Sequence, residues 1–295
     1  MKKISKILAA NRSEIAIRIF RAAEESGIKT AAIYSKEDRF AIHRFKTDES
    51  YLVGEGKGPI QAYLDIDSII KIAKDAKVDA IHPGYGFLSE SPELAEQCEK
   101  NDITFIGPSK EILKRFGNKT EAKKVAQDAD VKTVPSIAVS KENIKTIEKE
   151  VDKIGYPIIV KASWGGGGRG MRVVHSSKDL VDQITTAQSE SLKAFGKDEV
   201  FIEKFLEDAA HIEVQILGDK HGNILHLYER DCSLQRRHQK IIERAPAYFL
   251  KEETRKNICD AAIKIAKEVN YYGAGTVEFL FDKKTGEFYF IEVNP

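Results

Sequence analysis

Short apolar runs alternate with amphipathic segments along the first third of the chain, and this pattern restricts the fold more than any other feature. The apolar runs are residues 6–10, 30–35, 51–54, 79–84 and 103–108, and the amphipathic segments are residues 12–26, 66–76 and 92–101. Alternating strands and helices are typical of a parallel sheet whose two faces are covered by helices. The sequence therefore predicts an α/β domain here.

The first amphipathic segment carries signals for both of its ends. Its apolar residues recur at spacings of three and four, as expected for one face of a helix. Asn11 and Glu14 resemble a capping box at the start of the helix, and Gly27 stands where a glycine often follows a helix end. We therefore expect a helix over residues 12–26.

The pattern changes near Gly117. Two helical stretches follow, and then a region that holds its own strands and a glycine run, which predicts a domain boundary and an inserted lid. From His211 onward the apolar residues alternate with polar ones, apart from one helix near residues 251–270, which indicates an antiparallel α+β sheet. We expect domains over residues 1–117 and 118–295, with the lid at about 134–204.

Composition excludes several classes of protein. The chain has 295 residues, 42% of them hydrophobic, with 47 Lys and Arg against 46 Asp and Glu, a net charge of +1. Disorder is excluded, and no global charge favours nucleic acid or a membrane surface. Cys98, Cys232 and Cys259 form no CxxC pair, and no apolar run reaches the ~18 residues of a membrane span. A cytoplasmic location is the expectation.

A run of four glycines, Gly165–Gly168, follows Lys161 and a short SW dipeptide. Consecutive glycines expose backbone N–H groups and allow close approach to phosphates, so the run predicts a phosphate-covering flap. A formal GxGxxG match fails as a dinucleotide motif because a strand-like segment, and no helix, follows it. The alternative is a flexible hairpin turn. Lys161 and Lys119 are candidates to bind the same phosphates.

Two acidic residues and an asparagine lie at corresponding places in the last two predicted strands. Alternation predicts that the Glu278 side chain points to the opposite face of its strand from its apolar neighbours. It likewise predicts that Glu292 and Asn294 share one face of the last strand and that Ile291 points to the other. If the strands form a hairpin around the KKTGE turn, three oxygen ligands suited to Mg²⁺ or Mn²⁺ converge. The alternative is an exposed face with scattered acids.

The segment 229–240 concentrates positive charge, in Arg230, Arg236, Arg237, His238 and Lys240. It is a candidate pocket for a small anion or for phosphate. An RNA-binding stripe is disfavoured because no aromatic residues are interspersed. A buried salt-bridge network with Glu229, Asp231 and Glu243 is the stronger alternative. In the preceding strand, alternation puts His211, Glu213 and Gln215 on one face.

These segments together resemble the biotin carboxylase family of ATP-grasp enzymes. The strings that carry the resemblance are ANRSEIAIRIFRA, AIHPGYGFLSE, FIGPS, KASWGGGGRGMRVV, HIEVQILGD, ERDCSLQRRHQK and GTVEFLF with FYFIEVNP, so the resemblance runs from about Lys6 to Pro295. DESYLVGEGKGPIQAYLDI, Trp164 and the final VNP are more similar to the biotin carboxylase part of pyruvate carboxylases than to the separate subunit of acetyl-CoA carboxylase.

The resemblance implies a Rossmann-like N-terminal domain followed by an ATP-grasp domain whose glycine-rich lid closes over ATP. It also implies roles for single residues. Lys119 and Lys161 would hold the ATP phosphates, Gly167 and Gly168 would lie in the flap, and the hinge Glu203, Lys204, Phe205 and Leu206 would receive adenine. His211, Gln235 and His238 would surround the nucleotide, Glu278, Glu292 and Asn294 would bind the metal, and Lys240 would act catalytically near bicarbonate.

The implied reaction is ATP- and bicarbonate-dependent carboxylation of carrier-bound biotin through carboxyphosphate, the first half-reaction of a pyruvate carboxylase. ATP, Mg²⁺ or Mn²⁺ and biotin on a carrier are the implied cofactors. Bicarbonate, the biotin carrier domain and a carboxyltransferase domain are the implied partners, in a homo-oligomer, without nucleic acid or membrane. A biotin carboxylase subunit of an acyl-CoA carboxylase and a carbamoyl-phosphate-type ATP-grasp ligase are the enzymatic alternatives.

The sequence departs from the family pattern in three places. Ser13 stands where many relatives have Gly, a change expected to matter little, and Asn118 stands where many have Asp. Beyond the VNP, the family motif continues with Arg and Glu residues that hold bicarbonate and act as a base, and these are not in the sequence. We therefore expect an ATP-grasp domain that is incomplete at its C-terminal end, and a chain that alone binds ATP without turnover.

Overall fold

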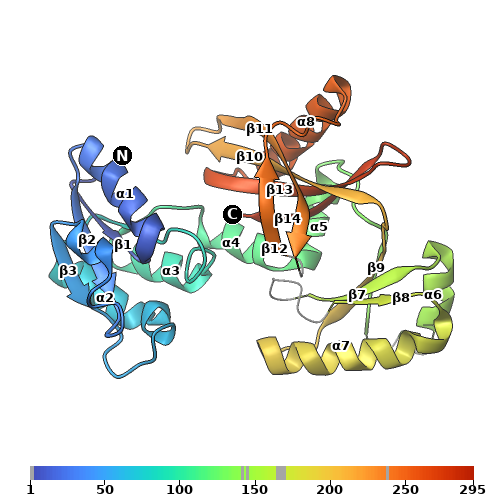
Figure 1. Ribbon diagram of the computed structural model, residues 1–295, viewed down its shortest axis with the longest axis horizontal. Coiled ribbons are helices and arrows are strands. Elements are labelled where there is room, and N and C mark those ends of the chain that lie inside the picture. The colour runs from blue at the N-terminus through green and yellow to red at the C-terminus, as the bar shows by residue number, and fades with distance from the viewer. Residues whose placement is uncertain (1–2, 141–142, 144–145, 164–170, 237–238) are drawn as a thin grey trace. The chain divides into compact units, whose positions relative to one another are not determined.

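The computed structural model describes residues 3–140, 143, 146–163, 171–236 and 239–295. The chain divides into two compact units, the first ending at Lys114 and the second spanning Arg115–Asn294 (Figure 1). Both contain helices and strands, and the predicted fold class is confirmed. No helix among the described residues is long and apolar enough to cross a membrane. The predicted site residues Gly167, Gly168 and His238 lie outside the described residues.

The first unit contains the predicted parallel sheet, with strand order β3-β2-β1-β4-β5. Its strands are β1 (Lys6–Ala9), β2 (Lys29–Tyr34), β3 (Glu49–Leu52), β4 (Ala80–His82) and β5 (Thr104–Phe105). Its helices are α1 (Ser13–Glu25), α2 (Ile66–Asp75) and α3 (Pro92–Lys100), with short 3₁₀ turns at Ile42–Phe45 and Gln61–Leu64.

Alternation along the buried strand β1 explains why helices cover both faces of this sheet. Leu8 packs in a core cluster with residues of α2 and α3, whereas Ile7 and Ala9 pack in a second cluster with residues of α1. Neighbouring residues of a strand point to opposite faces. Because β1 is apolar at successive positions, it supplies side chains to the cores on both faces, as expected for a parallel sheet.

The start of α1 differs from the predicted capping box. Arg12 occupies the cap position, and its side chain makes no capping hydrogen bond. The Asn11 amide instead donates to the backbone carbonyls of Pro83 and Tyr85, and Glu14 accepts a hydrogen bond from the Tyr85 hydroxyl. Both side chains hold the loop after β4, a long-range contact that the local pattern could not reveal.

The end of α1 follows the prediction. Gly27 has a φ of 69° and donates to the carbonyl of Glu24, while Ile28 donates to that of Ala23, which together form a Schellman motif. Ser13 also has a positive φ, 56°. A left-handed conformation costs a residue with a side chain about 1–2 kcal/mol, which the sequence expectation for this serine did not take into account.

Two helices, α4 (Lys110–Gly117) and α5 (Lys119–Asp128), precede a four-stranded sheet with order β6-β9-β7-β8, here called the lid sheet. Its strands are β6 (Ser136–Ala138), β7 (Ile158–Ala162), β8 (Arg172–Val174) and β9 (Val200–Lys204). Helices α6 (Ile147–Ile154) and α7 (Leu180–Phe195) bury Ile158, Val160 and Ile202 in one core cluster. The helices therefore cover one face of the lid sheet and leave Ile159 and Lys161 on the other.

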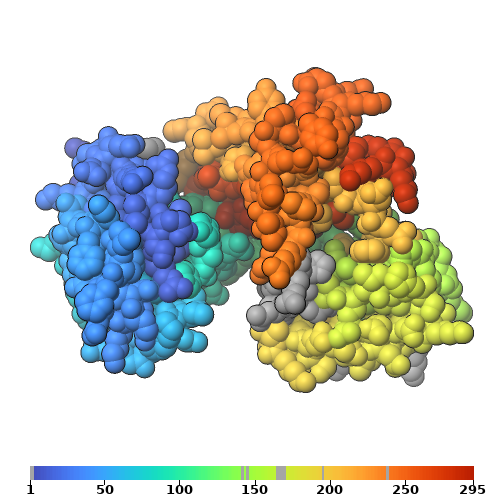
Figure 2. All heavy atoms as spheres, in the orientation of Figure 1, coloured from blue at the N-terminus to red at the C-terminus, as the bar shows by residue number. Residues whose placement is uncertain are grey.

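A five-stranded antiparallel sheet, here called the main sheet, follows with order β12-β11-β10-β13-β14. Its strands are β10 (Ala209–Gly218), β11 (Ile224–Arg236), β12 (Gln239–Arg244), β13 (Gly273–Asp282) and β14 (Phe288–Asn294). Helix α8 (Glu252–Glu268) packs against β10 and β11. The antiparallel prediction is confirmed, although β12 was not predicted. Figure 2 shows the atoms of the main sheet with α8 in gold to red and those of the lid segment in yellow-green to yellow.

The Asn118 side chain caps α5. Its Oδ1 accepts hydrogen bonds from the backbone N–H groups of Thr120 at 2.9 Å and Glu121 at 3.1 Å. Removing such a cap costs about 1 kcal/mol, so Asn118→Ala should lower the free energy of unfolding by that amount in urea denaturation. Asn118→Asp, which preserves the acceptor, should remain at the wild-type value. Equal stability of all three chains would contradict the role of the cap.

Candidate functional site

The second unit contains a cavity of about 330 Å³, here called the inter-sheet cavity, with walls from both the lid sheet and the main sheet. Small-ligand pockets measure about 300–1,000 Å³. Among its lining residues are these sequence-predicted ones: Lys119, Lys161, Glu203, Lys204, Phe205, Leu206, His211, Gln235, Lys240, Glu278 and Glu292. Asn294 does not line the cavity, but its amide donates to Glu278 Oε1 at 2.8 Å. Residues far apart in sequence therefore meet at one place.

Four apolar residues that line the cavity were not predicted as site residues: Ile159, Met171, Leu280 and Ile291. They lie there together with the predicted Phe205 and Leu206. Alternation could have found two of these residues, because Ile159 lies two positions before Lys161 and Leu280 two positions after Glu278. A wall that combines aliphatic surface with lysines and acids can accommodate a flat apolar ring and a charged chain in one ligand.

The β13–β14 hairpin brings the predicted acids together. Glu278 pairs directly with Glu292 across the ladder, but Phe279 pairs with Phe290, so Ile291 is an extra residue in β14. Such a bulge interrupts the alternation of faces. As a result Ile291 and Glu292 both line the inter-sheet cavity, and the prediction that they point apart was wrong.

The two facing acids favour a cation. Glu278 is buried, and burial together with the neighbouring Glu292 carboxylate raises its pKa, while Lys240 opposes this rise. Two carboxylates held side by side repel each other, and a bound divalent cation relieves that repulsion. The donor set, two carboxylates and the nearby amide of Asn294, consists of the hard oxygen ligands that Mg²⁺ prefers. The residues therefore fit a divalent metal.

Lys240, on β12, pairs with acidic residues of two other strands of the main sheet. Its Nζ lies 2.5 Å from Glu278 Oε1 and also pairs with Glu213 on β10. Burial alone would lower the pKa of Lys240, but Glu278 and Glu213 outweigh that effect and raise it above the ordinary lysine value. Lys240 is consequently a fixed positive charge at the cavity.

Arg230, in the segment 229–240, takes part in a network of ion pairs. Arg230 Nε donates to Glu213 at 2.9 Å and lies 3.6 Å from Glu243. Nearby ion pairs join Arg244 to Asp231 at 2.7 Å and Arg255 to Glu229 at 2.8 Å. For these residues the salt-bridge network is confirmed. Arg230 and Arg236 lie on β11 and Lys240 lies on β12, and Arg230 and Lys240 meet at Glu213.

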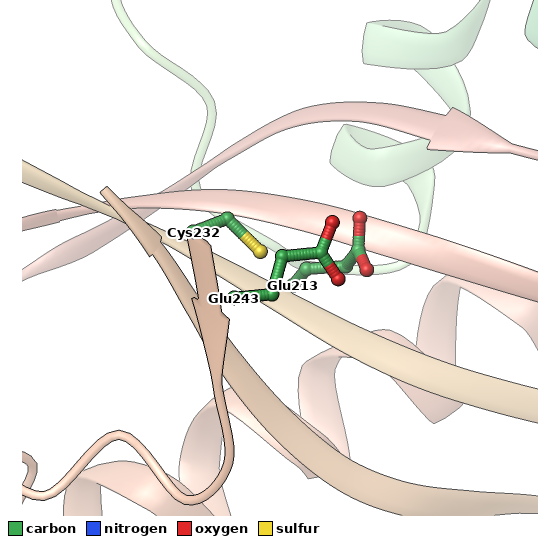
Figure 3. Close-up of side chains that lie close together, drawn as sticks. All are labelled: Glu213, Cys232 and Glu243. Carbon is green, nitrogen blue, oxygen red and sulfur yellow. The ribbon is translucent and has the colours of Figure 1, made fainter. Parts of the chain in front are cut away.

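Glu213, Cys232 and Glu243 also gather, with potential ligand atoms within 4.8 Å of one another (Figure 3). Burial raises the pKa of the Cys232 thiol to about 12. Glu213 already has Lys240 and Arg230 as partners. This group therefore supports the two basic side chains, and the predicted metal-binding residues remain Glu278, Glu292 and Asn294.

The remaining lysines of the cavity are each held by a partner. Lys119, the first residue of α5, lies 3.6 Å from Glu292 through its Nζ. Lys161, on β7, forms an ion pair with Glu203 on β9. The ammonium of Lys204 donates to the backbone carbonyls of Gly155 at 3.0 Å and Tyr156 at 2.9 Å, which links the end of β9 to the segment before β7.

One further lysine was missed. The sequence around Lys119 reads as ordinary helix surface, yet Lys123 is only 7% exposed and forms a second ion pair with Glu203. Burial would raise the pKa of Glu203, but Lys161 and Lys123 outweigh it and hold the pKa below the usual glutamate value. Its position four residues after Lys119, beside the buried Ala122, was the available signal.

Two antiparallel sheets around a nucleotide-sized cavity lined by lysines and paired acids define the second unit as an ATP-grasp domain. Residues 118–295 match the family model described as "Carbamoyl-phosphate synthase L chain, ATP binding domain". Residues 3–113 match "Biotin carboxylase, N-terminal domain". The chain belongs to the biotin carboxylase family of ATP-grasp proteins.

Known relatives agree with this assignment. Pyruvate carboxylase of Bacillus subtilis is 56% identical over 294 residues, a match that covers 100% of this chain and 25% of the relative. A biotin carboxylase β,γ-ATP complex from Campylobacter jejuni is 46% identical with a TM-score of 0.95, covering 99% of this chain and 65% of that one. The biotin carboxylase domain of Hydrogenobacter thermophilus 2-oxoglutarate carboxylase, in complex with MgADP, ADP and bicarbonate, is 45% identical with a TM-score of 0.93, covering 100% and 64%.

The chain thus spans about a quarter of the length of the curated relatives it matches.

The depressed pKa of Glu203 predicts how the stability of the chain changes with pH. A carboxyl whose pKa is lower in the folded than in the unfolded state stabilises the fold above the unfolded value, about 4.3, and loses this effect below it. Glu203→Gln should therefore cost about 3 kcal/mol at pH 7, and this deficit should shrink in denaturant titrations as the pH falls below about 4. A deficit that stays constant with pH would contradict the assignment.

Proposed function

We propose that this chain is the ATP-binding part of an enzyme that carboxylates carrier-bound biotin with ATP and bicarbonate, the first half-reaction of a pyruvate carboxylase. The observation that carries the proposal is the inter-sheet cavity, because its lining combines lysines, a facing pair of acids and apolar side chains. That combination suits the phosphates, the metal and the base of a nucleotide. The relatives support the choice of reaction.

The proposed roles follow from charge. Lys119 and Lys161 neutralise the phosphates, and Glu278 with Glu292 holds the Mg²⁺ or Mn²⁺ that spreads phosphate charge when bound. Phosphoryl transfer depends mainly on such positioning and neutralisation. The hinge at Glu203–Leu206 receives adenine, with His211 and Gln235 around the nucleotide.

Bicarbonate is the proposed nucleophile. One of its oxygens attacks the γ-phosphorus, ADP leaves, and carboxyphosphate results. The carboxyl group then passes to N1′ of biotin as the bond to phosphate breaks, and the released phosphate takes the N1′ proton. Lys240 offers a fixed positive charge beside the metal-binding acids, suited to an anion such as bicarbonate. The glycine flap is proposed to exclude water, because carboxyphosphate hydrolyses in an open site.

The partners are part of the same proposal. A biotin carrier domain and a carboxyltransferase domain would complete the reaction, in a homo-oligomer. A structural relative is a dimer of biotin carboxylase domains with bicarbonate bound. The dimer supports a homo-oligomer, and the bound anion supports bicarbonate as the substrate. The acceptor that fits the first relative is pyruvate, as its name states. A cytoplasmic location stays a prediction from the sequence.

Calorimetry with MgATP on the chain, followed by measurement of ATP cleavage, tests the function. We expect binding that weakens when Mg²⁺ is chelated, since the two acids would then repel the phosphates. Stimulation of ATP cleavage by bicarbonate plus free biotin, assayed in a carboxylase that contains this segment, separates biotin carboxylation from a carbamoyl-phosphate-type reaction. Binding without turnover in the chain alone would support an ATP-binding module, and absence of binding would contradict the proposal.

Lys240→Ala should affect bicarbonate chemistry more than nucleotide binding. Its ammonium pairs with Glu213 and Glu278, whereas Lys119 and Lys161 have other acidic partners, so these two lysines remain in place. In a biotin-dependent carboxylase that contains the segment, bicarbonate-dependent ATP cleavage should fall about a hundredfold or more, with ATP affinity changed much less. Equal losses of both would overturn the role given to Lys240.

A further inference from the structure

Lys123 is a buried charge outside the inter-sheet cavity. It lies on α5, a helix that packs against β14 and α8, and its side chain reaches β9 of the lid sheet. There its Nζ pairs with Glu203 and lies 4.8 Å from the centre of the Phe201 ring. Lys123 is not among the residues that line the cavity. Any effect on a ligand must therefore pass through Glu203.

A buried lysine needs a reason beyond stability. Burying an ammonium costs several kcal/mol, and apolar side chains of similar size are often as good or better for stability. The cost here is visible in the pKa of Lys123, which burial lowers although Glu203 opposes the effect. The other buried residues of α5, Ala122, Val125 and Ala126, are all apolar, so Lys123 is its one buried charge. The charge itself is therefore the feature to explain.

The explanation lies in the number of cations around Glu203. This carboxylate is 4% exposed and has two ammonium partners, Lys123 from α5 and Lys161 from β7. Only Lys161 lines the cavity, where a phosphate oxygen could replace Glu203 as its partner. If Lys161 moved away from a carboxylate with no other cation, a buried charge would be left unpaired, at high cost.

We propose that Lys123 is a positioning residue for nucleotide binding: it keeps Glu203 neutralised, so that Lys161 can exchange this carboxylate for a phosphate oxygen. The inference rests on the proposed function and adds a residue that the sequence pattern did not supply. Without Lys123, Glu203 would keep Lys161 as its only cationic partner. The phosphate would then have to compete with a buried carboxylate for the same ammonium.

Lys123→Met tests this directly, because Met fills a similar volume without the charge. We expect the affinity for MgATP to fall about tenfold, whereas the affinity for adenosine, which has no phosphate to attract Lys161, should stay within about twofold. Lys123→Arg should restore MgATP binding. Lys124→Met is the matched control: it removes the same charge from the next, exposed position of α5 and should bind both ligands as the wild type does.

A double-mutant cycle separates this role from a merely structural one. In a Glu203→Gln background the competing carboxylate is gone, so Lys123→Met should change MgATP affinity by less than about twofold. Thermal unfolding without nucleotide shows whether each variant is folded at the temperature of the titration. Equal losses of MgATP and adenosine affinity, or the same loss of MgATP affinity in both backgrounds, would overturn the inference.

The outcome for the wild-type chain distinguishes the two proposals. If the wild type does not bind MgATP, the proposed function fails. If it binds MgATP and Lys123→Met binds it equally well, the proposed function stands and the role of Lys123 is refuted.

Discussion

The carboxylate of Glu203 ties the lid sheet to the rest of the ATP-grasp unit. It is buried on β9, next to Lys161 on the neighbouring strand, and Lys123 reaches it from α5, which packs on β14 of the main sheet. Two buried ammonium groups without this carboxylate would repel each other in a medium of low dielectric constant. The placement of Lys161 at the cavity therefore depends on an interaction that fixes α5 as well.

The same principle extends around the inter-sheet cavity. Lys119 lies near Glu292, Lys161 pairs with Glu203, and Lys240 pairs with Glu278. Each of these lysines has an acidic partner, so the cavity holds its charges in place before a ligand arrives. A cation on Glu278 and Glu292 competes with Lys240 and Lys119 for these carboxylates. Metal and phosphate binding should therefore favour each other, and the coupling must be reciprocal.

The extent of successful prediction follows from the range of each interaction. Apolar alternation identified the strands of the main sheet except β12 and put Glu278 on the face of the site, because strand geometry fixes which residues share a face. It failed at Ile291, where one extra residue in β14 changes the facing. Asn11 was misread for a related reason: its partners lie more than seventy residues away in the loop after β4. Local patterns do not contain such contacts.

Lys123 shows how far helix geometry could have gone. Lys119 and Lys123 are four residues apart on α5, and residues at this spacing lie on the same side of a helix. The rotation of the helix that directs Lys119 toward Glu292 therefore also directs Lys123 into the interior, whereas Lys124 is left exposed. Because Asn118 fixes where α5 begins, one capping residue sets the positions of both lysines relative to the cavity. A phosphate-binding lysine and its supporting lysine thus come from a single helix, and neither can be reoriented without the other.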